Sequence, residues 1–201
     1  MNEGDIRYQV LNEEAAQSAV YQWWSRLVGA ENDSNDGPPP YSNGIRPVLR
    51  RAETPEEALL TDGFRLLWFT LPESLRKPWH MPAWGCVAAV LAEVREPDHE
   101  KNFAAAMGAQ VERTGRPRVS ELRFQQLYQS RNLEEFQRRM RRTVHLLGKK
   151  AHVLSLADGI LQWQQEKNGH PDYRPDRRLP VRWALAYFSE LAKYQKSSTA
   201  S

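Results

Sequence analysis

Apolar residues recur along most of the chain at spacings of three and four positions, the period of an α-helix with one buried face. No convincing alternation with a period of two and no hairpin signature interrupts this pattern. We therefore expect an all-α fold, a compact bundle of about eight or nine helices. They divide into two small lobes over about residues 10–108 and 118–195 of a single domain. The predicted helices cover residues 12–27, 44–52, 55–71 (as one or two helices), 82–95, 103–107, 120–129, 132–147, 155–167 and 180–194.

Several helix ends carry recognisable signals. Thr54 followed by Pro55 and Glu57 is typical of a helix start, and Asn132 with Glu135 forms a capping box. Gly148 is placed to end the helix that begins at Asn132. The Gly- and Pro-rich stretch 31–43 is expected to be a mobile loop, and residues 196–201 a disordered tail.

Length and composition favour one helical domain in a reducing compartment. The 201 residues suffice for a core without metals or disulfides, and the single cysteine, Cys86, excludes an intramolecular disulfide. The first residues lack the basic and apolar regions of a signal peptide. No apolar run approaches the roughly 18 residues of a membrane span. We expect a soluble protein in the cytoplasm that does not contact a membrane.

Charge is distributed unevenly along the chain. Residues 1–36 hold seven acidic and two basic residues, whereas residues 112–150 hold eleven basic and four acidic residues. Of the 28 basic residues, 21 are arginine, the residue best suited to hold phosphates and to stack on bases. The chain therefore has an acidic head and a basic middle.

The helix predicted over 132–147 concentrates this basic charge. At 100° per residue its apolar side chains share one narrow face, and four arginines point away from that face: Arg138, Arg139, Arg141 and Arg142. Glu134 and Glu135 can pair at i,i+4 with the first two of them, but Arg141 and Arg142 have no such local partner. A solvated charged face is the common interpretation of such a helix. The surplus charge instead favours a polyanion as partner, most commonly nucleic acid.

A second basic cluster precedes it. Arg46 and Arg50 share a helical face at i,i+4, and Arg51 follows. Cations at the negative end of a helix dipole would explain this cluster as well as ligand binding would.

The other chemically capable residues predict no catalytic site. The five histidines lack metal-ligand spacing, and Cys86 is expected to be a packing residue. Trp79 stands in a connector, where it could stack on a base, but packing in the core or between lobes is the expected role. No phosphate loop and no G-x-S-x-G motif is present. We expect no enzyme activity, no metal and no cofactor.

Three segments resemble the CasB family, the small subunit of the CRISPR surveillance complex Cascade of type I-E. They are Val48–Ala52 ahead of Thr54–Glu57, Val119–Phe124, and Arg138–Gly148. The last helix, with Arg182 and Trp183, also fits the family.

This resemblance implies an all-helical, non-catalytic protein that stabilises the R-loop in antiviral defence. The partners it implies are the backbone and large subunits of Cascade, a second copy of the chain, guide RNA, target DNA and the displaced single-stranded DNA. Residues 113–118, with Gly115 and Pro117, are predicted to form a basic loop. Together with this loop and the arginine face of helix 132–147, the resemblance gives the residues predicted to contact nucleic acid: Arg50, Arg51, Arg116, Arg118, Arg123, Arg138, Arg139, Arg141, Arg142 and Lys149.

Two other functions remain open. The helix pair 120–129 and 132–147 could form a helix-turn-helix in a stand-alone regulator that binds duplex DNA. Against this, the arginine face of the second helix carries no Asn or Gln near the start of that helix, where such a side chain would recognise adenine. A nuclease is a third class, and it lacks a cluster of carboxylates for Mg²⁺.

Overall fold

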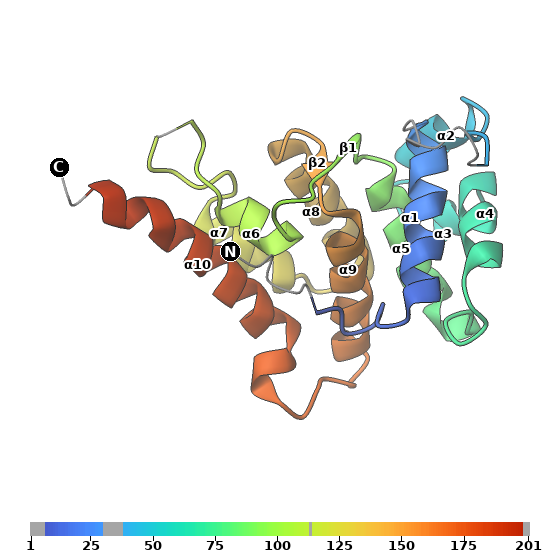
Figure 1. The fold of residues 1–201 in the computed structure, drawn as a ribbon. Helices are drawn as coiled ribbons and strands as arrows, with labels where there is room; N and C mark the ends of the chain where they lie inside the picture. The colour runs from blue at the N-terminus through green and yellow to red at the C-terminus, as the bar shows by residue number, and fades with distance from the viewer. Residues whose placement is uncertain (1–6, 30–37, 113, 199–201) are drawn as a thin grey trace.

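The computed structural model describes residues 7–29, 38–112 and 114–198, which form ten α-helices, two short 3₁₀ helices and one pair of two-residue strands (Figure 1). The all-α prediction is confirmed. The α-helices are α1 (Glu14–Val28), α2 (Ile45–Arg51), α3 (Pro55–Leu59), α4 (Asp62–Thr70), α5 (Met81–Leu91), α6 (Phe103–Gly108), α7 (Glu121–Tyr128), α8 (Leu133–Leu146), α9 (Val153–Lys167) and α10 (Leu179–Ser198). The 3₁₀ helices are Pro78–His80 and Pro175–Arg177, and strand β1 (Glu96–Pro97) pairs in parallel with β2 (Lys150–Ala151).

Helix α5 is the centre of the molecule. Every residue from Ala83 to Leu91 is buried. The reason is that α5 is packed against α3 and α4 from the N-terminal half of the chain and against α8 and α9 from the C-terminal half. Gly85 allows α3 to approach closely, since a Cβ at this position would lie 2.7 Å from the carbonyl oxygen of Pro55. A continuous cluster of buried side chains joins the two halves of the chain through this helix.

Helix α6 packs against α10 (Figure 1). Gly108 makes this approach possible, because a Cβ there would collide with the backbone carbonyl of Tyr187. The Tyr194 hydroxyl also donates to the carbonyl of Gly108, at 3.0 Å. The segment 103–108, which the sequence placed in the N-terminal lobe, therefore packs with the C-terminal helices.

Some element boundaries differ from the prediction. The predicted helix 82–95 ends at Leu91, because the backbone N–H groups of Arg95 and Glu96 turn to donate to the carbonyl of Lys149. The strand pair that follows is too short to leave an alternating pattern in the sequence. Helix α10 continues to Ser198, beyond the predicted end at 194 and into the predicted tail, of which residues 199–201 lie outside the described residues.

The predicted mobile loop 31–43 lies partly outside the described residues, which resume at 38. Arg26 of α1 holds the described part of this loop. Its Nε donates to the carbonyl of Pro39 at 2.9 Å, and its guanidinium carbon lies 4.1 Å from the ring centre of Tyr41. The backbone N–H of Tyr41 donates in turn to the carbonyl of Arg26. This part of the segment is thus fixed to α1.

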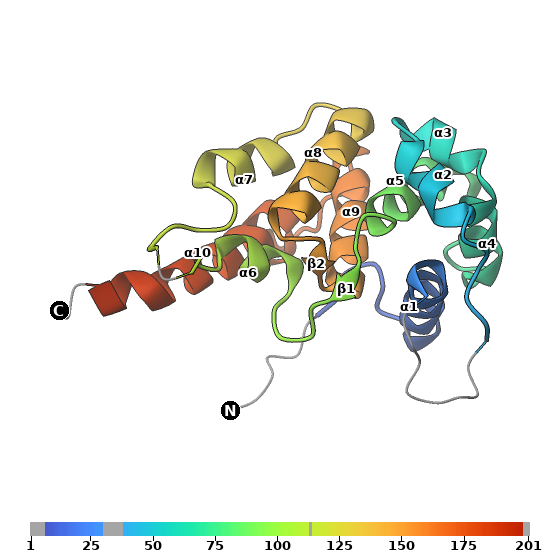
Figure 2. The same ribbon diagram turned by 90° about the horizontal axis from the view of Figure 1, so that it is seen from above.

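Figure 2 shows α7, α8 and α3 in a row along one long side of the molecule, with α2 beside α3. These four elements come from two stretches that are far apart in sequence, 45–59 and 121–146, and they carry all the predicted contact residues except Arg116, Arg118 and Lys149. None of the described helices is both long and apolar enough to cross a membrane.

Candidate nucleic-acid interface

Helix α8 is the scaffold of the candidate interface. The Asn132 side chain accepts from the backbone N–H of Glu135 at 2.8 Å, and the Glu135 carboxylate accepts from the backbone N–H of Arg131 at 2.8 Å. The predicted Asn132 cap is therefore present, but the Glu135 carboxylate bonds to the backbone N–H one residue before the cap and not to that of Asn132, as a strict capping box requires. Phe136, Met140 and Val144 on the apolar face are fully buried, and Leu133 is partly buried. Capping and burial together fix the direction of every side chain on the outer face.

The fold divides the four arginines of α8 into two kinds. Arg138 and Arg142 lie on the outer face and are exposed. Arg138 reaches only Glu134, at 3.8 Å, in the i,i+4 pair that the spacing predicts. Arg142 has no hydrogen bond or ion pair to any other described residue. These two cations are therefore available to an external polyanion.

Arg139 points from α8 toward α7. Its guanidinium forms an ion pair with Glu135 at 2.9 Å, the predicted i,i+4 partner. It also donates to the carbonyl of Gln126 and, at 3.3 Å, to the hydroxyl of Ser130. Arg139 thus bonds α8 to the C-terminal end of α7, with about a third of its side chain exposed.

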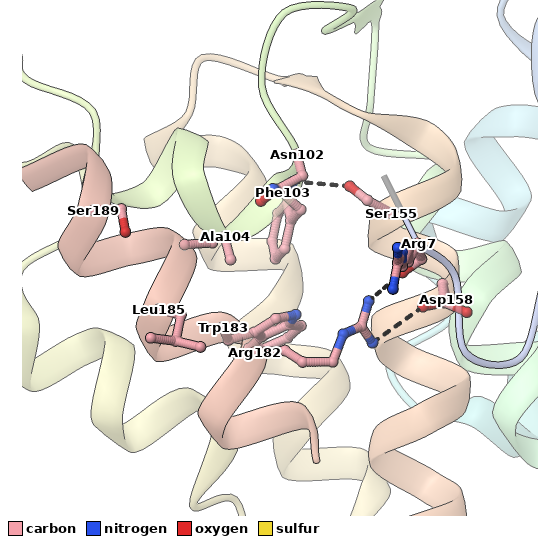
Figure 3. A pocket seen from close by; sticks show the side chains of 11 residues that line it. Arg7, Asn102, Phe103, Ala104, Ser155, Asp158, Arg182, Trp183, Leu185 and Ser189 are labelled. Carbon is pink, nitrogen blue, oxygen red and sulfur yellow. Dashed lines mark hydrogen bonds and ion pairs between the residues drawn. The ribbon is translucent and has the colours of Figure 1, made fainter. Parts of the chain in front are cut away.

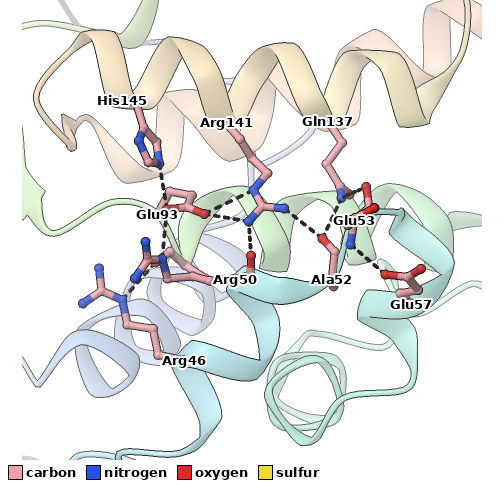
Figure 4. A network of polar contacts seen from close by, with 10 residues as sticks. Arg46, Arg50, Ala52, Glu53, Glu57, Glu93, Gln137, Arg141 and His145 are labelled. Carbon is pink, nitrogen blue, oxygen red and sulfur yellow. Dashed lines mark hydrogen bonds and ion pairs between the residues drawn. The ribbon is translucent and has the colours of Figure 1, made fainter.

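Arg141 points the other way, into the junction of α8 with α2 and α5 (Figure 4). Its Nη2 and Nε donate to Glu93 Oε1 at 2.7 and 3.2 Å, and its Nη1 donates to the carbonyl of Ala52 at 2.9 Å. Nη2 also donates to the carbonyl of Arg50. The expectation that Arg141 lacks a compensating carboxylate is therefore wrong. Its partner stands 48 positions earlier in the chain, so no local spacing rule could reveal it.

Arg50 meets the same carboxylate from α2. Its Nε donates to Glu93 Oε2 at 3.0 Å, and 36% of its side chain is exposed. His145 of α8 places Nε2 2.9 Å from this oxygen. Arg51, the last residue of α2, is exposed. Glu93 thus connects two helices that both carry predicted contact residues.

Arg46 closes the end of the central helix. Its Nε and Nη2 donate to the carbonyls of Ala92 and Val94 at 2.9 and 3.1 Å, just beyond the last turn of α5. A cation here satisfies orphan carbonyls and faces the negative end of a helix dipole. The dipole explanation therefore applies to Arg46, but with α5 as the helix and not α2.

The charges in this junction influence one another. Burial is the largest influence on the pKa of Glu93 and raises it, but hydrogen bonds from Arg141, His145 and Arg50 outweigh burial, so the pKa lies below its usual value. The pKa of Arg46 is lowered, first by burial and then by the nearby charges of Arg50 and Arg95. Several cations therefore surround a single buried carboxylate, leaving a net positive charge.

The remaining predicted residues lie at different distances from this junction. Arg123 is exposed on α7, in the row that contains α8, and Lys149 is half-buried just after α8. Arg116 and Arg118 are exposed in the loop between α6 and α7. The backbone of this loop bonds to α6, and Val119 at its end accepts from the hydroxyl of Tyr187 on α10. The loop therefore lies beside α6 and α10, apart from α2.

Three residues of the junction were missed in the sequence: Glu93, Arg95 and His145. One signal was available for Glu93, because a lone carboxylate that interrupts an apolar, buried segment needs a cationic partner. Nothing local identified which cations those would be.

Catalytic and metal chemistry finds little support among the described residues. Burial strongly raises the pKa of the Cys86 thiol, which is typical of an unreactive packing residue. The described residues contain no group of three or more His, Cys, Asp or Glu side chains that could hold a metal ion.

The expected packing role of Trp79 is wrong, since 69% of this residue is exposed.

A cavity of about 440 Å³ lies between α6, α9 and α10 (Figure 3). Its buried carboxylate, Asp158, accepts from the backbone N–H groups of residues 9–11 and lies 3.5 Å from Arg182. Arg182 donates to the carbonyl of Arg7 at 2.6 Å, and the Ser155 hydroxyl accepts from the first backbone N–H of α6. The polar groups of the cavity therefore hold the N-terminal segment and α6 in place.

Comparison with known proteins gives one match. A family model described as CRISPR-associated protein Cse2 matches residues 46–188, a span that begins in α2 and ends in α10. No curated protein and no solved structure matches the chain. The matched span includes every element of the candidate interface.

Proposed function

This chain belongs to the Cse2 family, the small subunits of the type I-E CRISPR complex Cascade, also called CasB, and we propose that it stabilises the R-loop of that complex. In this proposal its arginines bind the backbone of the guide RNA–target DNA duplex and of the displaced DNA strand. The family is structural and generally non-catalytic. The role of this chain is accordingly to hold nucleic acid and not to cleave it.

The observation that carries the proposal is the pair of exposed arginines on the outer face of α8. Arg142 is exposed and unpaired within the described residues, and Arg138 has only a 3.8 Å contact to Glu134. Arg123 and Arg51 are also exposed. They belong to α7, which lies next to α8, and to α2, which lies beside α3 (Figure 2). Exposed arginines on three separate helices match an extended phosphate backbone better than they match one small anion.

Such contacts determine position and not sequence. A guanidinium that binds phosphate oxygens takes no information from the bases, which base pairing with the guide RNA supplies instead. In a type I-E complex the small subunit therefore needs a basic surface, rigid helices and no recognition helix. The carboxylates at the start of α8, Glu134 and Glu135, would repel the phosphates that a recognition helix approaches with its N-terminal turn.

The proposal includes partners and location. The chain would act in the cytoplasm, bound to the backbone and large subunits of Cascade and to a second copy of itself. Guide RNA, target DNA and displaced single-stranded DNA would be its nucleic-acid ligands.

The direct test measures the affinity of the full chain for mixed-sequence single strands and RNA–DNA duplexes between about 50 and 200 mM salt. We expect affinity to fall steeply with salt and to depend little on sequence. Arg138→Ala/Arg142→Ala should weaken binding. The matched control Arg65→Ala/Arg177→Ala, which removes two exposed cations from α4 and the second 3₁₀ helix, should not.

Two outcomes would contradict the proposal. Equal affinity at both salt concentrations would exclude phosphate binding as its basis. Strong preference for one duplex sequence would support the stand-alone regulator instead.

A further inference from the structure

Glu93 is a buried carboxylate placed at a surface that otherwise carries positive charge. Its side chain is 3% exposed, and its two oxygens accept from different helices. Oε1 is bound by Arg141 of α8, and Oε2 by Arg50 of α2 and by His145 of α8 (Figure 4). A carboxylate in this position lowers the local positive potential and should weaken the attraction of nucleic acid to this surface. Long-range electrostatics alone therefore does not explain why a carboxylate is present here.

The two arginines that bind Glu93 use their donors differently. Arg141 uses Nε and both terminal nitrogens within the protein, and 20% of its side chain is exposed. Arg50 uses Nε alone, and 36% of its side chain is exposed. Within the described residues the two terminal nitrogens of Arg50 have no acceptor. These nitrogens form the fork with which a guanidinium binds two oxygens of one phosphate.

Further cations surround that fork. Arg50 and Arg95 both lie close enough to Arg46 that their charges lower its pKa, after the larger effect of burial. Arg51 is exposed next to it in sequence. Glu93 is the nearby carboxylate that opposes them, and it is engaged with Arg141. An anion that reaches the free side of Arg50 therefore meets a positive environment.

We propose that Glu93 is a positioning residue that holds the free side of Arg50 toward a backbone phosphate, with Arg141 as the internal anchor of Glu93. This inference rests on the proposed function and specifies one contact within it. Arg141, which the sequence counted among the contact residues, then acts through Glu93 and does not touch nucleic acid.

Positioning and plain electrostatics predict opposite results for Glu93→Gln. Removing a negative charge beside a basic surface should strengthen binding if only charge matters. Loss of the carboxylate that orients Arg50 should weaken binding if positioning matters. Each phosphate contact that is lost should lower the log–log slope of affinity against salt by about 0.7 to 0.9.

The experiment uses the full chain assembled with its partner subunits and guide RNA, and a labelled mixed-sequence single strand as probe. Five variants are compared with the wild type: Glu93→Gln, Arg50→Ala, Glu93→Gln/Arg50→Ala, Arg142→Ala and Glu93→Gln/Arg142→Ala. We expect Glu93→Gln and Arg50→Ala to weaken binding by the same factor, with no further loss in their double variant. The effect of Arg142→Ala should multiply with that of Glu93→Gln, because Arg142 has no bond to the junction.

Tighter binding by Glu93→Gln, or a full additional loss from Arg50→Ala in the Glu93→Gln background, would overturn this inference. If Arg142→Ala weakens binding and Arg50→Ala does not, this inference fails and the proposed function stands. If neither variant changes binding at any salt concentration, the proposed function fails as well.

Arg50→Lys provides a test that leaves Glu93 itself and its bonds to Arg141 and His145 in place. Lysine keeps the charge, but it has one nitrogen and cannot bond Glu93 and form a fork to a phosphate at the same time. We expect Arg50→Lys to bind nearly as weakly as Arg50→Ala. Wild-type affinity of Arg50→Lys would show that charge alone suffices and would overturn the proposal.

Discussion

The outer face of α8 and the junction beneath it place the same residue type in opposite situations. Arg142 on the outer face is exposed and unpaired within the described residues, whereas Arg141, its neighbour in sequence, has bonds to Glu93 and to two backbone carbonyls. The difference teaches that an arginine-rich helix is not one uniform binding surface. Tertiary contacts hold some of its arginines within the protein and leave others exposed. Mutations should separate the structural role of the first kind from the binding role proposed for the second.

The largest expected effect follows removal of the internal anchor. Arg141→Ala leaves Glu93 buried with fewer partners and leaves the carbonyls of Ala52 and Arg50 without this donor. Breaking a buried ion pair in this way lowers the free energy of unfolding by about 3 kcal/mol. Urea denaturation followed by circular dichroism measures it. Arg142→Ala is the matched control, with an expected change within about 0.5 kcal/mol. Similar stability of the two variants would show that the junction contributes nothing special.

The next effect is on binding and not on folding. Arg138→Ala/Arg142→Ala should lower the log–log salt slope by about 1.4 to 1.8, which corresponds to two phosphate contacts. Thermal unfolding of the double variant should match the wild type, because both side chains are exposed. An unchanged slope would place the nucleic-acid contacts elsewhere on the molecule.

Arg139 provides an intermediate case. It is about one-third exposed and bonds Glu135 and the carbonyl of Gln126. Arg139→Ala should lower the free energy of unfolding by about 1 kcal/mol, because hydrogen bonds and a partly exposed ion pair are lost. Urea denaturation should therefore rank this variant between Arg141→Ala and Arg142→Ala. A rank outside that interval would break the relation between burial and role.

The smallest expected effect is the pH dependence of the unfolding free energy that protonation of Glu93 causes, which develops only in acid. Its pKa in the folded protein lies below the usual value of 4.5, since the hydrogen bonds from Arg141, His145 and Arg50 outweigh the effect of burial. The unfolded chain therefore binds this proton first, and the stability that Glu93 contributes is lost as the pH falls below about 4.5. The difference in unfolding free energy between wild type and Glu93→Gln should narrow over that range. A difference that is constant from neutral to acidic pH would contradict the assignment.

Local features of α8 could be predicted from the sequence because they depend on neighbours within one or two turns. The Asn132 cap, the apolar face around Phe136 and the pairs Glu134–Arg138 and Glu135–Arg139 all belong to this class. Helical periodicity and capping involve residues at most four positions apart, so both partners of each interaction can be identified from a short stretch of sequence.

Other features could not be predicted because their partners are distant in sequence. The packing of α6 on α10 depends on the contact of Gly108 with the backbone of Tyr187. Trp79 is exposed because no other helix of the described residues covers it in the folded chain. The sequence pattern around Trp79 shows an aromatic residue in a connector, but not the surface next to it.

The sequence by itself determined an all-helical chain with basic charge on one face of one helix, and its family match assigns it to the small subunits of Cascade. Only the tertiary structure decided which arginines remain available. Arg141 and Glu93 are 48 positions apart, and Arg50 and Glu93 are 43 apart. They meet because α2 and α8 pack around the end of the central helix α5. Burial of apolar side chains drives that packing and has no direction of its own, so the pairing of charges is settled only when the helices are in place.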